Sequence, residues 1–307
     1  KIKDMDDKTL EIYKAIFNNS ILFLKRGIDE IINSAQELTK EQFVVSCLFI
    51  QTSLELGLKA FLVKEKGIKA ILKNGHQNQT VDSIFNSFEN NDLRTKTYND
   101  LKKLILENEI TLFGEIHFEH LTRFQKFRNN LVHLNLSFSS TDLQNLKYES
   151  IFAIVHLIIP LLSEIDFENE TPSEFYAEYL DDHQYKKLIS FPHYIEEMEK
   201  VAKKFTGYAY ECPECYTKTF SPGNGICYCC NLNFIDAAEY VNCKICNAEN
   251  AVIFDSLNIE LNGDMINGLC LNCGDKPNVF KCPHCECKQT FYGKDELKNS
   301  CFDGCKN

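Results

Sequence analysis

The chain has 307 residues, of which 44% are apolar, and its formal net charge is -11. This length has room for two domains with a real hydrophobic core. This net negative charge excludes a protein that coats nucleic acid non-specifically, so any contact with RNA must be made by a small positive site on an otherwise acidic surface. There is no apolar run of roughly eighteen residues or more, which argues against a transmembrane helix.

Two long helices are predicted at the start of the chain. Apolar residues recur at helical spacing over residues 8–35, as on one face of an amphipathic helix. Thr39 followed three residues later by Gln42 is a capping box, and it predicts a second helix that stops at Gly67. Cys47 lies on the apolar stripe of this second helix and is expected in the core.

The middle of the chain predicts shorter helices and then two more long ones. Short helices are expected between residues 80 and 107, and a longer helix over 117–134. A last long helix is predicted to start at a capping box of Thr141 and Gln144, and Pro160 is expected to kink it. The N-terminal region is therefore expected to be an all-α bundle.

The helix over 117–134 carries the residues with the clearest chemistry. Arg128 offers a bidentate phosphate contact, His133 an acid or base near neutral pH, and Asn129 a polar positioning group. Only four of the 33 basic residues are arginines, so an arginine here is suggestive. On a straight helix Arg128 lies roughly 140° from His133, too far to grip one phosphate easily. The two can converge if the helix breaks near His133 or if a second copy supplies residues, and we therefore expect a dimer.

Composition changes twice after this bundle. Residues 164–182 hold eight acidic residues and no Lys or Arg, which is typical of a linker. From residue 208 onward Cys, Gly and Asn dominate. We therefore expect a helical bundle over 5–165, an acidic linker with a short helix over 166–207, and a cysteine-rich module over 208–307. The fold class is α+β multidomain, with an all-α bundle followed by small β-rich modules.

Fourteen of the fifteen cysteines follow residue 210, mostly as C-x-x-C pairs. This spacing is typical of metal sites and of the reducing cytosol, so a cytoplasmic location is expected. Two thiolates from one tight turn reach a tetrahedral ion, and two such turns complete a closed zinc site. Six pairs predict two to three structural zinc ions, bound by Cys212, Cys215, Cys227 and Cys230; by Cys243, Cys246, Cys270 and Cys273; and by Cys282, Cys285, Cys301 and Cys305.

The third zinc site and the role of the module stay open. The last pair is wider by one residue, so Cys287 or His284 could replace a ligand there. Residues 208–307 contain eight Lys, no Arg and thirteen acids, a net charge of -5. Such a surface binds RNA phosphates poorly, which favours docking to a protein or to the helical domain of the same chain.

The bundle resembles HEPN domains (higher eukaryote and prokaryote nucleotide-binding), which occur in many prokaryotic toxin, abortive-infection, antiviral-defence and CRISPR-associated ribonucleases. The likeness covers roughly residues 5–165. It rests on Arg128, Asn129 and His133 as an R-x4-H motif late in the bundle. It also rests on Glu55 and Lys59, which match the E-x-x-x-K pattern of an earlier HEPN helix.

The resemblance implies a metal-independent endoribonuclease that works as a homodimer. The RNA 2′-hydroxyl would attack the adjacent phosphate and leave a 2′,3′-cyclic phosphate. His133 would move the proton, Arg128 would stabilise the transition-state charge, and Asn129 would orient His133 or the phosphate. Glu55 would hold Arg128 or His133. Catalysis would need no cofactor.

Two observations qualify the resemblance. A HEPN subgroup controlled by nucleotidyltransferase antitoxins carries a modified Tyr two residues after the His, whereas this chain has Asn135. The acidic, Arg-poor surface suits an alternative function, in which a catalytically inactive HEPN dimer serves as a scaffold that binds RNA or protein through its zinc ribbons. The RNA target, the activating trigger and any antitoxin are not indicated by the residues.

Overall fold

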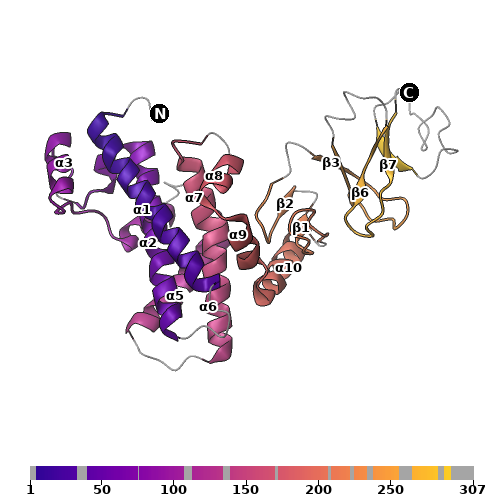
Figure 1. Ribbon diagram of the computed structural model, residues 1–307, viewed down its shortest axis with the longest axis horizontal. Coiled ribbons are helices and arrows are strands. Elements are labelled where there is room, and N and C mark those ends of the chain that lie inside the picture. The colour runs from indigo at the N-terminus through magenta and orange to yellow at the C-terminus, as the bar shows by residue number, and fades with distance from the viewer. Residues whose placement is uncertain are drawn as a thin grey trace. The chain divides into compact units, whose positions relative to one another are not determined.

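The structure, a computed structural model, describes residues 5–32, 40–74, 76–106, 113–133, 139–169, 172–206, 209–221, 225–233, 238–255, 265–282 and 287–291. The chain divides into two units, Lys1–His193 and Tyr194–Asn307. The first is helical, and small antiparallel sheets occur only in the second among the described residues (Figure 1). The coarse expectation of an α+β arrangement is therefore confirmed.

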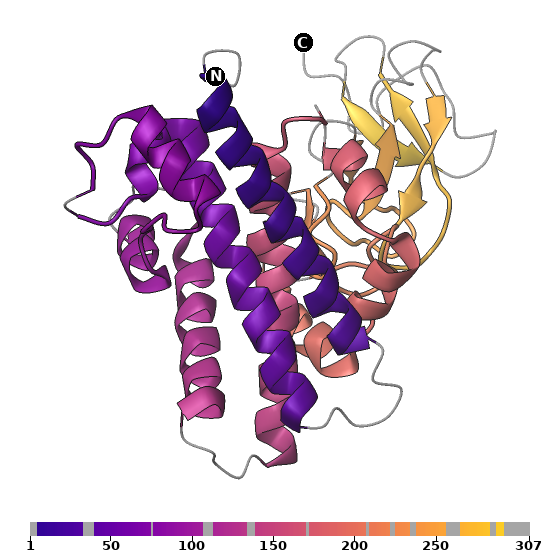
Figure 2. The same cartoon turned by 60° about the vertical axis from the view of Figure 1, so that its left-hand side comes forward.

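Helices α1 (Asp7–Ile32) and α2 (Lys40–Lys66) form a long antiparallel pair (Figure 2). The apolar face of α1 is buried along its length, as the helical spacing predicts. The two helices approach closely where Gly27 has no side chain, since a Cβ there would lie 2.9 Å from Cγ1 of Ile50. This pair is the framework on which the rest of the unit is built.

Two serines join α1 to α2 inside the core. Ser20 donates its hydroxyl to the carbonyl of Ser53 at 2.7 Å, and Ser53 donates to the carbonyl of Ser20 at 2.9 Å. Both polar side chains are thereby satisfied although neither touches solvent. Cys47 on α2 is also buried, as expected for a core residue.

Helix α2 ends just before Gly67, whose backbone φ angle is +81°. Short helices follow it. They are the 3-10 turn η2 (Ile68–Ile71), α3 (Val81–Glu89) and α4 (Tyr98–Leu106). The start of α4 is fixed by Thr97 and Asp100. The Asp100 carboxylate accepts the Thr97 backbone N–H at 2.9 Å, and this bond places Tyr98 at the first position of the helix.

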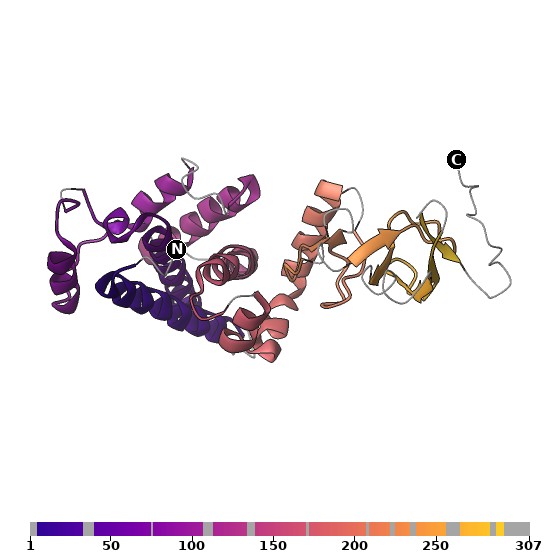
Figure 3. The ribbon, with the colours of Figure 1, turned by 90° about the horizontal axis from the view of Figure 1, so that it is seen from above.

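The second half of the unit holds α5 (Glu115–His133), α6 (Ser140–Phe152), the π-helical segment η3 (Ala153–Ile158) and α7 (Ile159–Ile165). Elements α6, η3 and α7 form one rod, which Figure 3 shows end-on between α1 and α5. The π-turns precede Pro160, which has no N–H for the carbonyl four residues earlier.

The N-terminal cap of α6 differs from the prediction. The capping box is formed by Ser139 and Asp142, not by Thr141 and Gln144. The Ser139 hydroxyl accepts the Asp142 backbone N–H at 3.2 Å, and the Asp142 carboxylate accepts the Ser139 N–H at 3.0 Å. Two boxes overlap in this sequence, and the upstream one is satisfied on both sides.

The segment over 166–207 carries α8 (Pro172–Tyr179), α9 (Asp182–Ile189) and α10 (Pro192–Thr206). The first two belong to the helical unit, where an acidic linker was expected. Its acidic residues alternate with aromatic ones, and the ring of Phe167 lies 5.3 Å from that of Phe17 on α1. The aromatic residues therefore pack this segment onto the bundle.

The described residues of the second unit form most of α10 and three small antiparallel sheets. The strands are β1 (Phe220–Ser221) with β2 (Ile226–Cys227); β3 (Ala238–Val241), β4 (Val252–Asp255) and β6 (Leu269–Cys270); and β5 (Met265–Asn267), β7 (Asn278–Lys281) and β8 (Lys288–Phe291). Gly268 joins β5 to β6 at a tight point, since a Cβ there would lie 2.5 Å from Cγ1 of Val252.

Two helical stretches within the described residues, Gln42–Lys66 and Thr141–Ile165, pass a membrane-span test of length and apolar content. Of their most apolar windows, 56% and 83% are buried by the rest of the chain. Core helices of soluble proteins pass the same test, so these two helices are weak evidence for a membrane span.

Candidate functional site

Helix α5 carries the three predicted motif residues in its last two turns. Asn129 is exposed, and His133 is the last residue of the helix. The side chains of Arg128 and His133 lie outside what the structure describes. The backbone places Asn129 and His133 one turn apart, so both start from the same side of α5.

A polar cavity of about 420 Å³ lies beside Asn129. Its walls come from α2, from the start of α4 and from α5. Glu55 on α2 and Asn129 on α5 both line it, so the structure brings together two of the four residues singled out from the sequence. We call it the α2–α5 cavity. Its volume is within the range of small-molecule pockets, roughly 300–1,000 Å³.

Glu55 is held by the lysine of the E-x-x-x-K pattern. The Lys59 ammonium donates a 2.7 Å hydrogen bond to Oε1 of Glu55, one helical turn away, and the two side chains are only 10% and 28% exposed. The expected role of Glu55 was to hold Arg128 or His133. Among the described side chains, its ion-pair partner is Lys59.

Two buried polar atoms at this cavity have no hydrogen-bond partner in the described part of the chain. They are Oε1 of Gln51 and the hydroxyl of Tyr98. Burial, helped by the negative charge of Glu55, raises the pKa of Tyr98 well above its ordinary value. The phenol therefore keeps its proton and remains a hydrogen-bond donor.

A second group of ionisable side chains joins α5 to α6, two turns before the motif. His120 is buried, and its Nδ1 lies 2.6 Å from Oε2 of Glu149. Arg123 donates from Nε to Oε1 of the same carboxylate at 2.7 Å. Burial, together with the nearby imidazole of His120, lowers the pKa of His117 to about 4. The sequence reading missed this group, although His117, His120 and Arg123 recur every three residues on one helix.

Eight cysteines of the second unit form two tetrads that could each hold a metal ion. Within each tetrad all four sulfurs lie within 4.8 Å of one another. Four sulfur pairs are 3.6 to 3.9 Å apart: Cys212 with Cys230, Cys215 with Cys227, Cys243 with Cys273, and Cys246 with Cys270. A tetrahedral ion with metal–sulfur bonds of about 2.3 Å requires sulfurs about 3.8 Å apart. Both predicted tetrads therefore fit such an ion.

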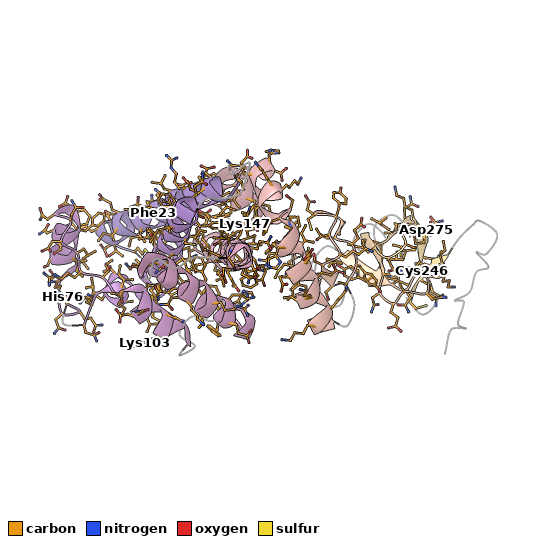
Figure 4. All side chains as sticks on the ribbon, turned by 90° about the horizontal axis from the view of Figure 1, so that it is seen from below. Phe23, His76, Lys103, Lys147, Cys246 and Asp275 are labelled. Carbon is orange, nitrogen blue, oxygen red and sulfur yellow. The ribbon has the colours of Figure 1, made fainter. Side chains whose placement is uncertain are left out.

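Each cysteine pair of a tetrad lies in a turn, and each of these turns contains the same type of backbone hydrogen bond. The first cysteine of a pair donates its backbone N–H to the carbonyl five residues later at 2.8 to 3.0 Å: Cys212 to Thr217, Cys227 to Leu232, Cys243 to Ala248, Cys270 to Asp275 and Cys282 to Cys287. Figure 4 labels Cys246 and, near it in the same unit, Asp275.

The third predicted site is described only at its beginning. Cys282 is buried and makes the same backbone hydrogen bond as the first cysteines of the other four turns. Its acceptor, Cys287, occupies the position that non-cysteine residues hold in those turns. Cys285, Cys301, Cys305 and the alternative ligand His284 lie outside the described residues.

Comparison with known proteins gives no match: no family model, curated protein or solved structure matches this chain.

Proposed function

We propose that the helical unit is a HEPN-type domain that cleaves RNA without a metal, as a prokaryotic defence or toxin effector in the cytoplasm. The main support is the α2–α5 cavity. Glu55 and Asn129 were singled out from two sequence patterns 74 positions apart, and both line this cavity. Residues from two separate HEPN-like sequence patterns thus line one cavity beside α5.

The chemistry would be an internal transfer at the phosphate. His133 takes the proton of the RNA 2′-hydroxyl, and the 2′-oxygen forms a bond to phosphorus as the bond to the 5′-oxygen breaks. The imidazolium of His133 gives this proton to the departing 5′-oxygen, so no water is consumed and a 2′,3′-cyclic phosphate remains. The guanidinium of Arg128 stabilises the negative charge that gathers on the phosphate oxygens. Asn129 orients the imidazole or the phosphate.

The active form would be a homodimer. Arg128 and His133 leave a straight helix roughly 140° apart, so one copy cannot easily direct both at one phosphate. A two-fold axis beside α5 would place the arginine of one copy opposite the histidine of the other. The site would then contain two copies of each motif.

The cysteine tetrads would hold structural Zn²⁺, two ions in the described part of the chain and a third at Cys282. A four-cysteine site has no open position for substrate, so the ions would stabilise the fold and take no part in cleavage. Free thiolates of this kind persist in a reducing cytoplasm. The module would dock a protein, because its residues 208–307 carry eight Lys, no Arg and thirteen acids.

The second candidate function is an inactive HEPN dimer acting as a scaffold. It is favoured by apolar side chains at the metal-binding turns, where Tyr216 is 75% and Ile245 49% exposed. Exposed apolar groups of this kind suit a protein partner.

The test is cleavage of RNA by the purified full chain in EDTA. Wild type should cut, and both His133→Ala and Arg128→Ala should lose at least about 100-fold in rate. Lys126→Ala, which removes an exposed positive charge from the same helix, should cut like wild type. Equal cleavage by all four proteins, or none by wild type, would favour the scaffold.

A further inference from the structure

The α2–α5 cavity has unused hydrogen-bonding capacity. Gln51 and Tyr98 each bury a polar atom there without a partner among the described residues. Leaving such an atom unpaired costs about 1–3 kcal/mol, so a folded protein rarely keeps two of them in one place. A ligand that pairs with both would explain why they are kept.

The positions of these groups define a pattern of donors and acceptors. Gln51 and Glu55 are four residues apart on α2, so their side chains share one face of the helix. Within the described part of the chain Lys59 occupies Oε1 of Glu55, and Oε2 is left as an acceptor beside the carbonyl oxygen of Gln51. Tyr98, only 6% exposed, adds an O–H donor from α4. The cavity therefore presents two neighbouring acceptors and one donor.

The α5 wall of the cavity is joined to α4 by hydrogen bonds. Gln125 on α5 donates to Oδ1 of Asn99 at 2.7 Å, and its Oε1 accepts from Lys102 at 3.0 Å. Its polar groups are thus used within the protein. A planar ligand between these walls would meet the unpaired groups on the α2 and α4 side.

We propose that this cavity binds a guanine base of the RNA, next to the bond that is cut. Guanine alone among the four bases presents two adjacent N–H donors, N1 and N2, followed by an acceptor, O6. The N2 amino group would donate to Gln51, N1–H would donate to Glu55, and O6 would accept from Tyr98. Adenine and cytosine each offer one amino donor beside an acceptor, and uracil offers one N–H between two acceptors. The placement beside the cut bond rests on the proposed ribonuclease function, whereas guanine binding itself does not.

Binding is measured by calorimetric titration of the full chain with guanosine 3′-monophosphate, inosine 3′-monophosphate and adenosine 3′-monophosphate. Inosine lacks only the N2 amino group. Loss of that hydrogen bond should weaken binding about tenfold, and adenosine should bind more weakly still. Gln51→Leu should reduce the guanosine-to-inosine ratio towards one. Gln144→Leu, an exposed position on α6, should keep the wild-type ratio.

Tyr98→Phe separates a ligand contact from a structural role. It removes a buried hydroxyl without a partner, so the ligand-free protein should melt at the same or a higher temperature. Guanosine monophosphate binding should nevertheless weaken about tenfold. Equal affinity for all three nucleotides, or no binding by a folded wild type, would overturn the guanine site. Because this titration requires no cleavage, its failure is distinct from failure of the ribonuclease proposal, which the EDTA assay tests alone.

Discussion

Nδ1 of His120 on α5 lies 2.6 Å from Oε2 of Glu149 on α6, and both side chains are almost fully buried. Arg123, 46% exposed, binds the other oxygen of the same carboxylate at 2.7 Å. These contacts fix the rotation of α5 about its own axis against the central rod. They therefore set the direction in which Asn129 points, two turns later on the same helix.

Glu149→Ala should destabilise the helical unit by about 3–5 kcal/mol, because it leaves Arg123 and the buried His120 without their acceptor. Urea unfolding followed by circular dichroism measures this loss. Asp182→Ala is the control, since it breaks an exposed pair with Lys186 and should cost less than about 0.5 kcal/mol. A Glu149→Ala variant as stable as Asp182→Ala would contradict the role given to the pair.

His117 should make the helical unit less stable in acid. Burial, helped by His120, lowers its pKa from 6.5 to about 4 in the folded chain, so the unfolded chain binds a proton more readily. The stabilisation is then complete above pH 6.5 and is lost as the pH falls from 6.5 towards 4, by at most about 3 kcal/mol.

The matched variant for this effect is His117→Asn. In the wild type the backbone N–H of Gly114 donates to Nδ1 of His117 at 2.9 Å, and the asparagine keeps an acceptor near that N–H. Unfolding free energies of both proteins are compared between pH 4 and pH 7. The variant should lose less stability over that range than wild type. Parallel pH profiles would show that His117 is not the group responsible.

Removal of one tetrad ligand should remove one metal ion. Cys230→Ser should lower bound zinc by one equivalent per chain, because Cys230 belongs to a tetrad of closely spaced sulfurs. Cys229→Ser, its buried neighbour outside that tetrad, should keep the wild-type content. Metal content is measured by mass spectrometry of the purified proteins. Equal zinc in the two variants would mean that the ligands are assigned wrongly.

Tyr216 should lower the stability of the second unit. It has φ +58° at the position where the other three described tetrad turns have Asn231, Asn247 and Gly274. A left-handed backbone disfavours a bulky side chain, so Tyr216→Asn should stabilise the second unit by about 1 kcal/mol. Asn247→Tyr, also exposed, should destabilise it by a similar amount. Thermal unfolding of the zinc-loaded chain measures both, and a loss of stability in Tyr216→Asn would contradict this account.

The sequence predicted those features that depend on spacing. Helical periodicity placed α1, α2 and α5, and C-x-x-C spacing paired Cys212 with Cys227 and Cys243 with Cys270 in the correct tetrads. Both signals are local or repeat along the chain. These features can therefore be predicted without knowledge of tertiary contacts.

Features that depend on contacts between distant segments could not be predicted. The acidic stretch after residue 164 gave no sign that Phe167 packs on Phe17. The unpaired atoms of Gln51 and Tyr98 are recognisable only once α2 and α4 are placed together. The sequence offers two overlapping capping boxes for α6, one starting at Ser139 and one at Thr141, and only the hydrogen bonds show which of them forms.

The central claim is that the 2′-hydroxyl of RNA attacks the adjacent phosphate with no metal involved. The most direct test is to identify the product ends from an RNA oligonucleotide in EDTA, alongside the same oligonucleotide with 2′-deoxyribose at the cut position. The account predicts 2′,3′-cyclic phosphate and 5′-hydroxyl ends from RNA and no cut at the deoxy position. Cleavage of the deoxy substrate, or 5′-phosphate ends from RNA, would mean that water attacks the phosphate and would contradict it.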